Sequence, residues 1–190
     1  MQPLPLDERL ERVGHHILRA RLFLDLWSYF EEEGSRSKII ETMDEYSDFF
    51  RFTPHAYFVA YVIYIAGVFD KDRLTISLIN LINDAKAEGQ LKGKEAATVT
   101  ALLNDEAKPL ADKVLKLRHN AFAHRSAHIS YDDVFAMAAV TPGQLRDLTD
   151  VALRIANTLL QARGLPVQYF TELPKAHAEA MMKALQRTPV

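Results

Sequence analysis

Apolar residues recur every three or four positions along most of this chain, and no stretch of it alternates apolar and polar residues. In the first periodic stretch they are Leu10, Val13, Ile17, Ala20, Leu24 and Trp27. This spacing places them on one face of an α-helix, whereas a half-buried strand would show a period of two. The pattern therefore predicts an all-α fold made of consecutive helices.

Capping and turn residues divide this pattern into separate helices. The expected ranges are 6–32, 35–50, 54–69, 74–88, 92–123, 130–139, 142–163 and 172–185. Ser35, Thr53 and Thr141 are the N-cap candidates, and the two threonines are each followed by a proline at the first helical position. Pro109 predicts a kink or a division within 92–123, because proline cannot donate a helical hydrogen bond.

The connections between these ranges are short, which favours antiparallel packing of neighbouring helices. We therefore expect a single-domain antiparallel helical bundle of about seven to eight helices. We assign this bundle to residues 1–163 and expect residues 164–190 to form a C-terminal segment with a short helix. The range 54–69 is apolar nearly all round, which predicts a central position.

The composition excludes several kinds of functional site. The 190 residues include no cysteine, which rules out a disulfide scaffold, a thiolate zinc site and a cysteine nucleophile. Only 7 residues are glycine, which argues against phosphate-binding loops and Rossmann turns. The net charge of -2 gives no overall attraction to nucleic acid, so an anionic partner would have to bind a local basic patch.

The stretch 108–128 differs from the rest of the chain in charge. Its basic residues are Lys108, Lys113, Lys116, Arg118 and Arg125, against the single acid Asp112. It also holds three of the seven histidines, namely His119, His124 and His128. Arginine binds phosphate oxygens bidentately and stays charged, while histidine can accept and return a proton near neutral pH. This stretch is therefore the candidate site for chemistry at a phosphate.

The ten residues 117–126 resemble the signature of the HEPN superfamily (higher eukaryotes and prokaryotes nucleotide-binding). That signature is an arginine, commonly followed by Asn, Asp or His, with four to six residues before a histidine. Arg118, His119 and His124 match it in order, with five residues between Arg118 and His124. The sequence Ala123-His124-Arg125 and the segments 69–78 and 130–133 are similar to the AbiU-type abortive-infection branch, although Ser126 stands where that branch often has Asp.

The resemblance implies a metal-independent endoribonuclease with a phage-defence or toxin-like role and no cofactor. The RNA 2′-OH would attack the adjacent phosphate, with His124 as general acid or base and Arg118 neutralising charge on the phosphorus. The candidate supporting or substrate-binding residues are His119, Asn120, Arg125 and Lys116. The resemblance also implies a homodimer that acts on RNA, with an antitoxin protein as a further partner.

The helical geometry bears on how these residues meet. On an unbroken α-helix, Arg118 and His124 would lie roughly 120° apart, so either the helix ends between them or two chains share one groove. Asn120 and His124 are four apart and would share a face, which would let Asn120 orient His124.

Less specific interpretations of the same residues stay open. The chain could be a non-catalytic HEPN-like module that binds RNA, a nucleotide or a protein, or simply a structural helical protein. Arg118 could form an ion pair with Asp132 or Asp133, and His124 could be a core histidine. His124 and His128 have a spacing that can bind zinc, but Arg125 is a cation at the position where such motifs carry glutamate, so we expect no metal site.

The chain also gives an expectation about location. Its longest apolar run, 56–69, has 14 residues, fewer than the roughly 20 that cross a bilayer. The first residues carry acids where a signal peptide carries bases. We therefore expect a cytoplasmic protein without a membrane segment.

Overall fold

The protein is all-α in the computed structural model, which describes residues 4–123, 133, 136 and 138–187 and contains no strand within them. The helices are α1 (Leu6–Glu31), α2 (Glu33–Arg36), α3 (Ile40–Glu45), α4 (Ser47–Phe50), α5 (Thr53–Val68), α6 (Leu78–Ala87), α7 (Gly93–Ala101), η1 (Leu102–Ala107), α8 (Lys108–Leu117), η2 (Arg118–Ala123), α10 (Pro142–Ala162) and α11 (Leu173–Leu185), where η denotes a π-helix. The predicted antiparallel helical bundle is confirmed.

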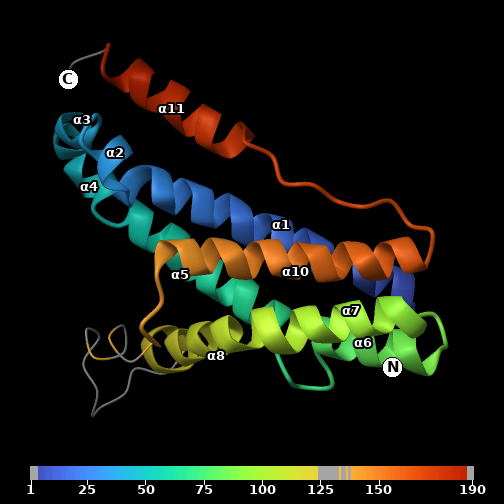
Figure 1. Ribbon diagram of the computed structural model, residues 1–190. Helices are drawn as coiled ribbons and strands as arrows, with labels where there is room; N and C mark the ends of the chain where they lie inside the picture. The colour runs from blue at the N-terminus through green and yellow to red at the C-terminus, as the bar shows by residue number, and fades with distance from the viewer. Residues whose placement is uncertain (1–3, 124–132, 134–135, 137, 188–190) are drawn as a thin grey trace.

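The long helices α1, α5 and α10 pack side by side, and α6, α7 and α8 form a further layer along them (Figure 1). The core lies between these layers and is made of aliphatic side chains from every long helix. Tyr61 at the middle of α5 is fully buried, and its hydroxyl donates a hydrogen bond of 2.9 Å to the carbonyl oxygen of Leu145. The central position predicted for the apolar helix is therefore confirmed.

The boundaries predicted for the helices 6–32 and 142–163 agree with those of α1 and α10 to within one residue. α1 buries Leu10, Val13 and Ile17 completely, as the three-and-four spacing requires. α10 begins after Thr141, whose hydroxyl accepts a hydrogen bond from the backbone N–H of Gln144, while the Gln144 amide accepts one from the N–H of Thr141. This reciprocal capping box satisfies two backbone donors that a helix start leaves open.

The single helix predicted over 35–50 is wrong, because the chain forms the three short helices α2, α3 and α4 there. Ser35 lies inside α2 and is not its N-cap. Ile39, Met43 and Phe50 turn instead toward α11 and form a second apolar cluster with Met182. Tertiary packing therefore overrides local helix propensity in this corner.

The N-cap predicted at Thr53 is also wrong. Thr53 is the first residue of α5, after an N-cap at Phe52, and its hydroxyl donates to the carbonyl oxygen of Phe49 in the preceding turn. The side chain therefore joins α4 to α5 and leaves the backbone donors at the start of α5 without a side-chain cap.

The helix predicted from residue 74 begins only at Leu78, with Ser77 as its N-cap. Residues 69–77 form a loop in which Asp72 accepts a hydrogen bond from the backbone N–H of Leu74. The side-chain amide of Asn80 donates to the carbonyl oxygens of Asp72 and Thr75. Short polar side chains that bond to nearby backbone groups compete with helix formation, which explains the later start.

The helix predicted over 92–123 is divided into α7, η1, α8 and η2. The buried residues Leu102 and Ala107 are five positions apart, and the π-helix η1 spans this interval. Its wider turn keeps both side chains on the core face. Pro109 is the second residue of α8, directly after η1, so the helix type changes from π to α next to this proline.

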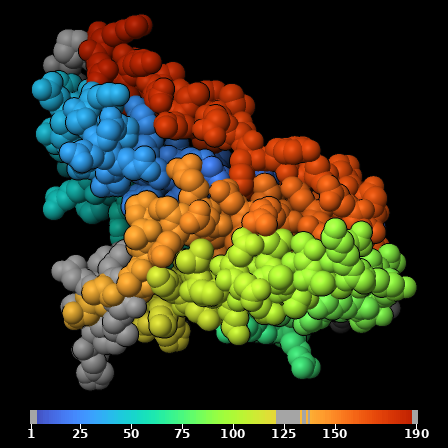
Figure 2. Space-filling view, viewed as in Figure 1, coloured from blue at the N-terminus to red at the C-terminus, as the bar shows by residue number. Residues whose placement is uncertain are grey.

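The chain after α10 turns at Gly164, runs back in an extended conformation and ends in α11 (Figure 1). The side chain of Asn157 on α10 holds this return by two hydrogen bonds of 2.9 Å with the backbone N–H and carbonyl oxygen of Gln168. Figure 2 shows α11 resting on the surface formed by α1 and its neighbours. No helix within the described part of the chain has the length and apolarity that a membrane span needs.

Candidate functional site

Arg118 is the first residue of η2, the π-helical turn that continues α8. Its Nη1 donates a hydrogen bond of 3.2 Å to Oδ2 of Asp70, which lies just beyond the end of α5. The Arg118 side chain is 40% exposed and that of Asp70 is 23% exposed. A guanidinium has five N–H donors, and this ion pair uses one of them to orient the group.

The position of Asp70 is itself fixed by the loop that contains it. Its second carboxylate oxygen, Oδ1, accepts a hydrogen bond of 3.0 Å from the backbone N–H of Asp72. The two oxygens of one carboxylate therefore join Arg118 to the backbone of the 69–77 loop. Asp70 is thus an ion-pair partner of Arg118 that the sequence interpretation did not name, while Asp132, which it did name, lies outside the described residues.

The candidate supporting residues occupy the end of α8 and the start of η2. Lys116 and His119 are exposed, and Asn120 is half-buried. The Asn120 side-chain amide donates a hydrogen bond of 3.1 Å to the carbonyl oxygen of Lys116, and so bonds to the backbone of the last turn of α8. The structure thus brings Arg118, His119 and Asn120 together on one turn.

The other two candidates, His124 and Arg125, lie outside the described residues, as do His128 and Asp132. The α-helical angle expected between Arg118 and His124 does not apply, because residues 118–123 form a π-helix. The shared face expected for Asn120 and His124 involves a residue outside the described part of the chain and stays a prediction.

A second set of contacts fixes the chain where it enters α10. The ammonium group of Lys113 donates hydrogen bonds of 2.9 Å to the carbonyl oxygen of Ala139 and 3.2 Å to Oε1 of Gln144. Ala139 has a φ of 44°, a left-handed conformation that costs free energy in a residue with a side chain. Lys113 therefore has a structural role, although it belongs to the basic stretch.

A hollow of approximately 240 Å³ lies between α8, η1 and the start of the 69–77 loop, and its lining includes Phe69 and Lys71, the two chain neighbours of Asp70. Its walls include the side chains of Phe69, Leu103 and Leu115. At its rim the ammonium group of Lys71 lies 3.5 Å from Oδ1 of Asp112. Lys71 directly follows Asp70, so the hollow and the arginine share one loop.

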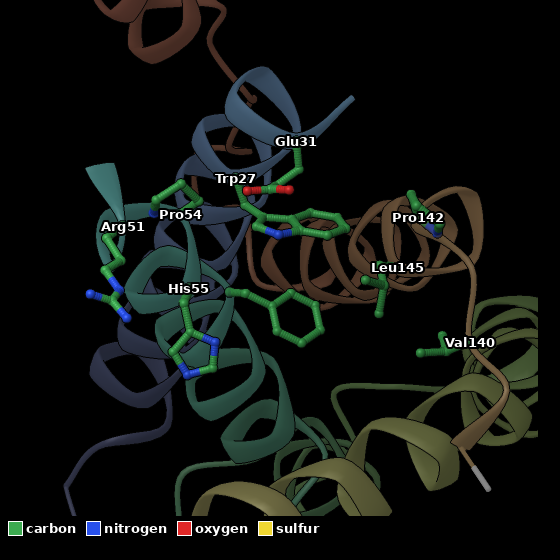
Figure 3. Close-up of a pocket in the computed structure, with 9 residues that line it drawn as sticks. Trp27, Glu31, Arg51, Pro54, His55, Val140, Pro142 and Leu145 are labelled. Carbon is green, nitrogen blue, oxygen red and sulfur yellow. The ribbon is translucent and has the colours of Figure 1, made fainter. Parts of the chain in front are cut away.

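A larger hollow of approximately 400 Å³ lies at the other end of α5 (Figure 3). The indole of Trp27 and the ring of Phe58 form its aromatic wall, with ring centroids 5.0 Å apart. Arg51 and His55 border it from the start of α5, and Pro142 and Leu145 from the start of α10 (Figure 3). Trp27 is half-buried, so it serves both the core and this hollow.

Among the residues that the structure describes, no three His, Asp or Glu side chains converge in a way that could hold a metal ion.

Sequence comparison places this arrangement in a known family. The family model HEPN_AbiU2, described as AbiU2, matches residues 4–179. The chain belongs to the HEPN_AbiU2 family. The match includes every helix from α1 to α10, the Arg118–Asp70 pair and both hollows. Neither the curated proteins nor the solved structures compared with this HEPN_AbiU2 chain include a match.

The residue that sequence reasoning missed is Asp70. The sequence marks the segment 69–78 only by its similarity to the AbiU-type branch. The available signal is an acid directly after the apolar stretch 54–69, 48 positions before Arg118. Spacing along one helix cannot find such a partner, because the contact depends on how α5 and α8 pack.

Proposed function

We propose that this protein is a metal-independent endoribonuclease of the HEPN type, with a phage-defence or toxin-like role. In the proposed reaction a 2′-oxygen–phosphorus bond forms as the phosphorus–5′-oxygen bond breaks. The 2′-OH loses its proton to a general base, and the leaving 5′-oxygen gains one from a general acid. The products are a 2′,3′-cyclic phosphate and a 5′-OH.

The observation that carries the proposal is the environment of Arg118. Among the described residues its guanidinium has one hydrogen-bond partner, Asp70, and its side chain is 40% exposed. A guanidinium that is fixed on one side and open on the other can bind a phosphate as charge develops on it. An arginine that served only to close an ion pair would gain nothing from this exposure.

His124 is assigned the proton transfer. It follows η2 directly in the sequence, and it completes the Arg-His pattern in a chain of the HEPN_AbiU2 family. Imidazole titrates near neutral pH and can act as base in one step and acid in the other. His119, Asn120, Lys116 and Arg125 are proposed to bind the RNA backbone around this pair.

We further propose that two copies of the chain form a homodimer in the cytoplasm, with a motif from each facing one groove, and that an antitoxin protein restrains the activity. Sedimentation at micromolar concentration tests the first part. A dimer is expected, and a strictly monomeric species would contradict a groove shared by two chains.

The enzymatic proposal is tested by incubating structured RNA with the full chain in EDTA. Wild type is compared with Arg118→Ala and His124→Ala, and with Arg12→Ala as a matched control. Arg12 is an exposed arginine paired with Glu8 on α1, far from Arg118 in the sequence. Cleavage is expected for wild type and the control and should fall by at least 100-fold in the other two. Equal cleavage in all four proteins would overturn the assignment.

The alternative, a non-catalytic module that binds RNA, a nucleotide or a protein, is favoured by the hollow in Figure 3. Its aromatic wall and Arg51 suit a planar ligand that carries negative charge. Trp27 is the single tryptophan of the chain and lines this hollow, so its fluorescence can report on a ligand bound there. Quenching by nucleotides, together with no RNA cleavage by wild type, is the outcome that this alternative predicts.

A further inference from the structure

Two residues that line the hollow, Phe69 and Lys71, flank Asp70, the ion-pair partner of Arg118. On α8 the hollow is bordered by Lys108, Asp112 and Leu115, which lie on one stripe of the helix. Leu115 precedes Arg118 by three positions, a rise of about 4.5 Å along the helix axis. A ligand in the hollow would therefore lie against the loop that holds Asp70 and one helical turn before Arg118.

The chemistry of the hollow is that of a site for a planar, partly polar group. Its floor is apolar and includes the buried Phe69 together with Leu103, Leu115 and Ile79. Its volume of approximately 240 Å³ is below the ~300 Å³ at which pockets for drug-sized ligands begin, so it suits one ring system and not a larger ligand.

Asn104 supplies the polar contact on one wall. It belongs to the π-helix η1, and its side chain lines the hollow. Asn104 is exposed, so its amide is accessible to a ligand that enters the hollow. An amide both donates and accepts, which is what the edge of a nucleobase requires.

Two lysines give the rim its affinity for anions. Lys108 is exposed at the start of α8. Lys71 forms an ion pair with Asp112, with 3.5 Å between Nζ and Oδ1. A nucleotide has an apolar ring face, a polar ring edge and a phosphate, which match the floor, the amide and the lysines in turn. An unmodified protein side chain lacks the phosphate, and a lipid lacks the ring.

We infer that this hollow binds the nucleobase of the RNA nucleotide next to the phosphate held by Arg118, with Asn104 at the base edge and Lys71 and Lys108 at the backbone. This inference rests on the proposed function and adds a subsite to it. The site therefore recognises unpaired RNA, because a base can enter the hollow only when it is unstacked from its neighbours.

The test measures binding of adenosine 3′-monophosphate to the full chain by calorimetry, with ribose 5-phosphate as the ligand that lacks a base. Leu103→Trp fills the hollow with a larger side chain. Lys108→Gln removes a positive charge from the rim, and because Lys108 is exposed we expect this substitution to leave the fold intact. Lys94→Gln on α7 is the matched control, since Lys94 is an exposed lysine outside the hollow. We expect adenosine 3′-monophosphate to bind Leu103→Trp and Lys108→Gln at least tenfold more weakly than wild type, and to bind Lys94→Gln as tightly as wild type. Ribose 5-phosphate should bind wild type at least tenfold more weakly than adenosine 3′-monophosphate does.

Equal affinity in wild type and Lys108→Gln would overturn the inference. So would binding that quenches Trp27 fluorescence and is unaffected by Lys108→Gln, because the ligand would then occupy the hollow of Figure 3. RNA cleavage that requires Arg118 without nucleotide binding in the hollow would refute the subsite alone. Nucleotide binding in the hollow without RNA cleavage would refute the proposed function alone.

Discussion

Asp70 and Arg118 are 48 residues apart in the sequence and are joined by a hydrogen bond of 3.2 Å between Oδ2 and Nη1. The contact links the end of α5 to the first residue of η2. Both side chains are partly exposed, and exposed ion pairs contribute only about 0–1 kcal/mol to stability. The pair therefore serves mainly to set the direction of the guanidinium.

Asp70→Asn should consequently impair activity more than stability. The amide retains a similar shape but loses the charge that holds Arg118, so we expect RNA cleavage to fall by about tenfold while the free energy of unfolding changes by less than about 1 kcal/mol. Cleavage rates and urea unfolding measure the two effects. Asp44→Asn, at an exposed position on α3, is the control and should change neither. A large loss of stability with unchanged activity would show that the pair is structural.

The buried ion-pair cluster between α1 and α10 predicts a pH dependence. Asp25 accepts hydrogen bonds of 2.9 and 3.0 Å from Nε of Arg21 and lies 3.5 Å from Nη1 of Arg146, with Glu172 as a further nearby charge. Burial raises the pKa of Asp25 above its ordinary value, and this effect outweighs the opposing attraction of Arg21 and Arg146.

Because the pKa of Asp25 is raised on folding, the folded protein binds more protons than the unfolded chain between the ordinary and the raised value. The contribution of this group to stability is thus present at pH below the ordinary pKa and is lost as the pH rises through the folded pKa. Relative to the non-titrating Asp25→Asn variant, wild type should gain stability between pH 7 and pH 4 in urea unfolding. A relative loss over that range would mean that the arginines dominate.

Tyr61→Phe tests the polar contact at the centre of the core. The hydroxyl donates to the carbonyl oxygen of Leu145, which also accepts a hydrogen bond from the hydroxyl of Thr149. Since that acceptor keeps a partner, we expect the substitution to cost only about 0.5–1.5 kcal/mol in urea unfolding. Tyr61→Ala should cost about 3–5 kcal/mol, because it leaves a cavity. Similar costs for the two variants would contradict this division between hydrogen bonding and packing.

The two hydrogen bonds between Asn157 and the backbone of Gln168 hold the extended segment after α10, and we expect their loss to make this segment mobile. Asn157→Ala removes both bonds to the backbone of Gln168, so residues 165–172 should become sensitive to limited proteolysis at protease concentrations that leave wild type intact. Asn157 is only half-buried on α10, so we expect the variant to keep the fold of this helix. Unchanged proteolysis would show that α11 alone holds the segment, through its contacts with Phe30 and Met43.

The sequence predicts those parts of the fold that depend on local spacing. The stripe from Leu10 to Leu24 and the cap at Thr141 each specify a long helix without help from the rest of the chain. The short helices over 35–50 could not be predicted, because Ile39 and Phe50 pack against α11, more than a hundred positions away. The π-helix η1 left only a weak signal, the five-residue interval from Leu102 to Ala107.

The candidate site likewise has a part that the sequence predicts and a part that depends on how the helices pack. Arg118 and its neighbours in the basic stretch are visible in the sequence, since they form a local pattern. Asp70 and the hollow lined by Leu103 and Lys71 arise from the packing of α8 against the end of α5, and no linear spacing encodes that arrangement.

The central claim is that a 2′-OH of RNA attacks the phosphate held by Arg118. The most direct measurement incubates the full chain in EDTA with an RNA oligonucleotide and with the DNA oligonucleotide of the same sequence. The account predicts that the RNA is cut to fragments ending in 2′,3′-cyclic phosphate, that the DNA stays intact, and that Arg118→Ala abolishes the cut. Cleavage of both strands, or RNA fragments without the cyclic phosphate, would contradict it.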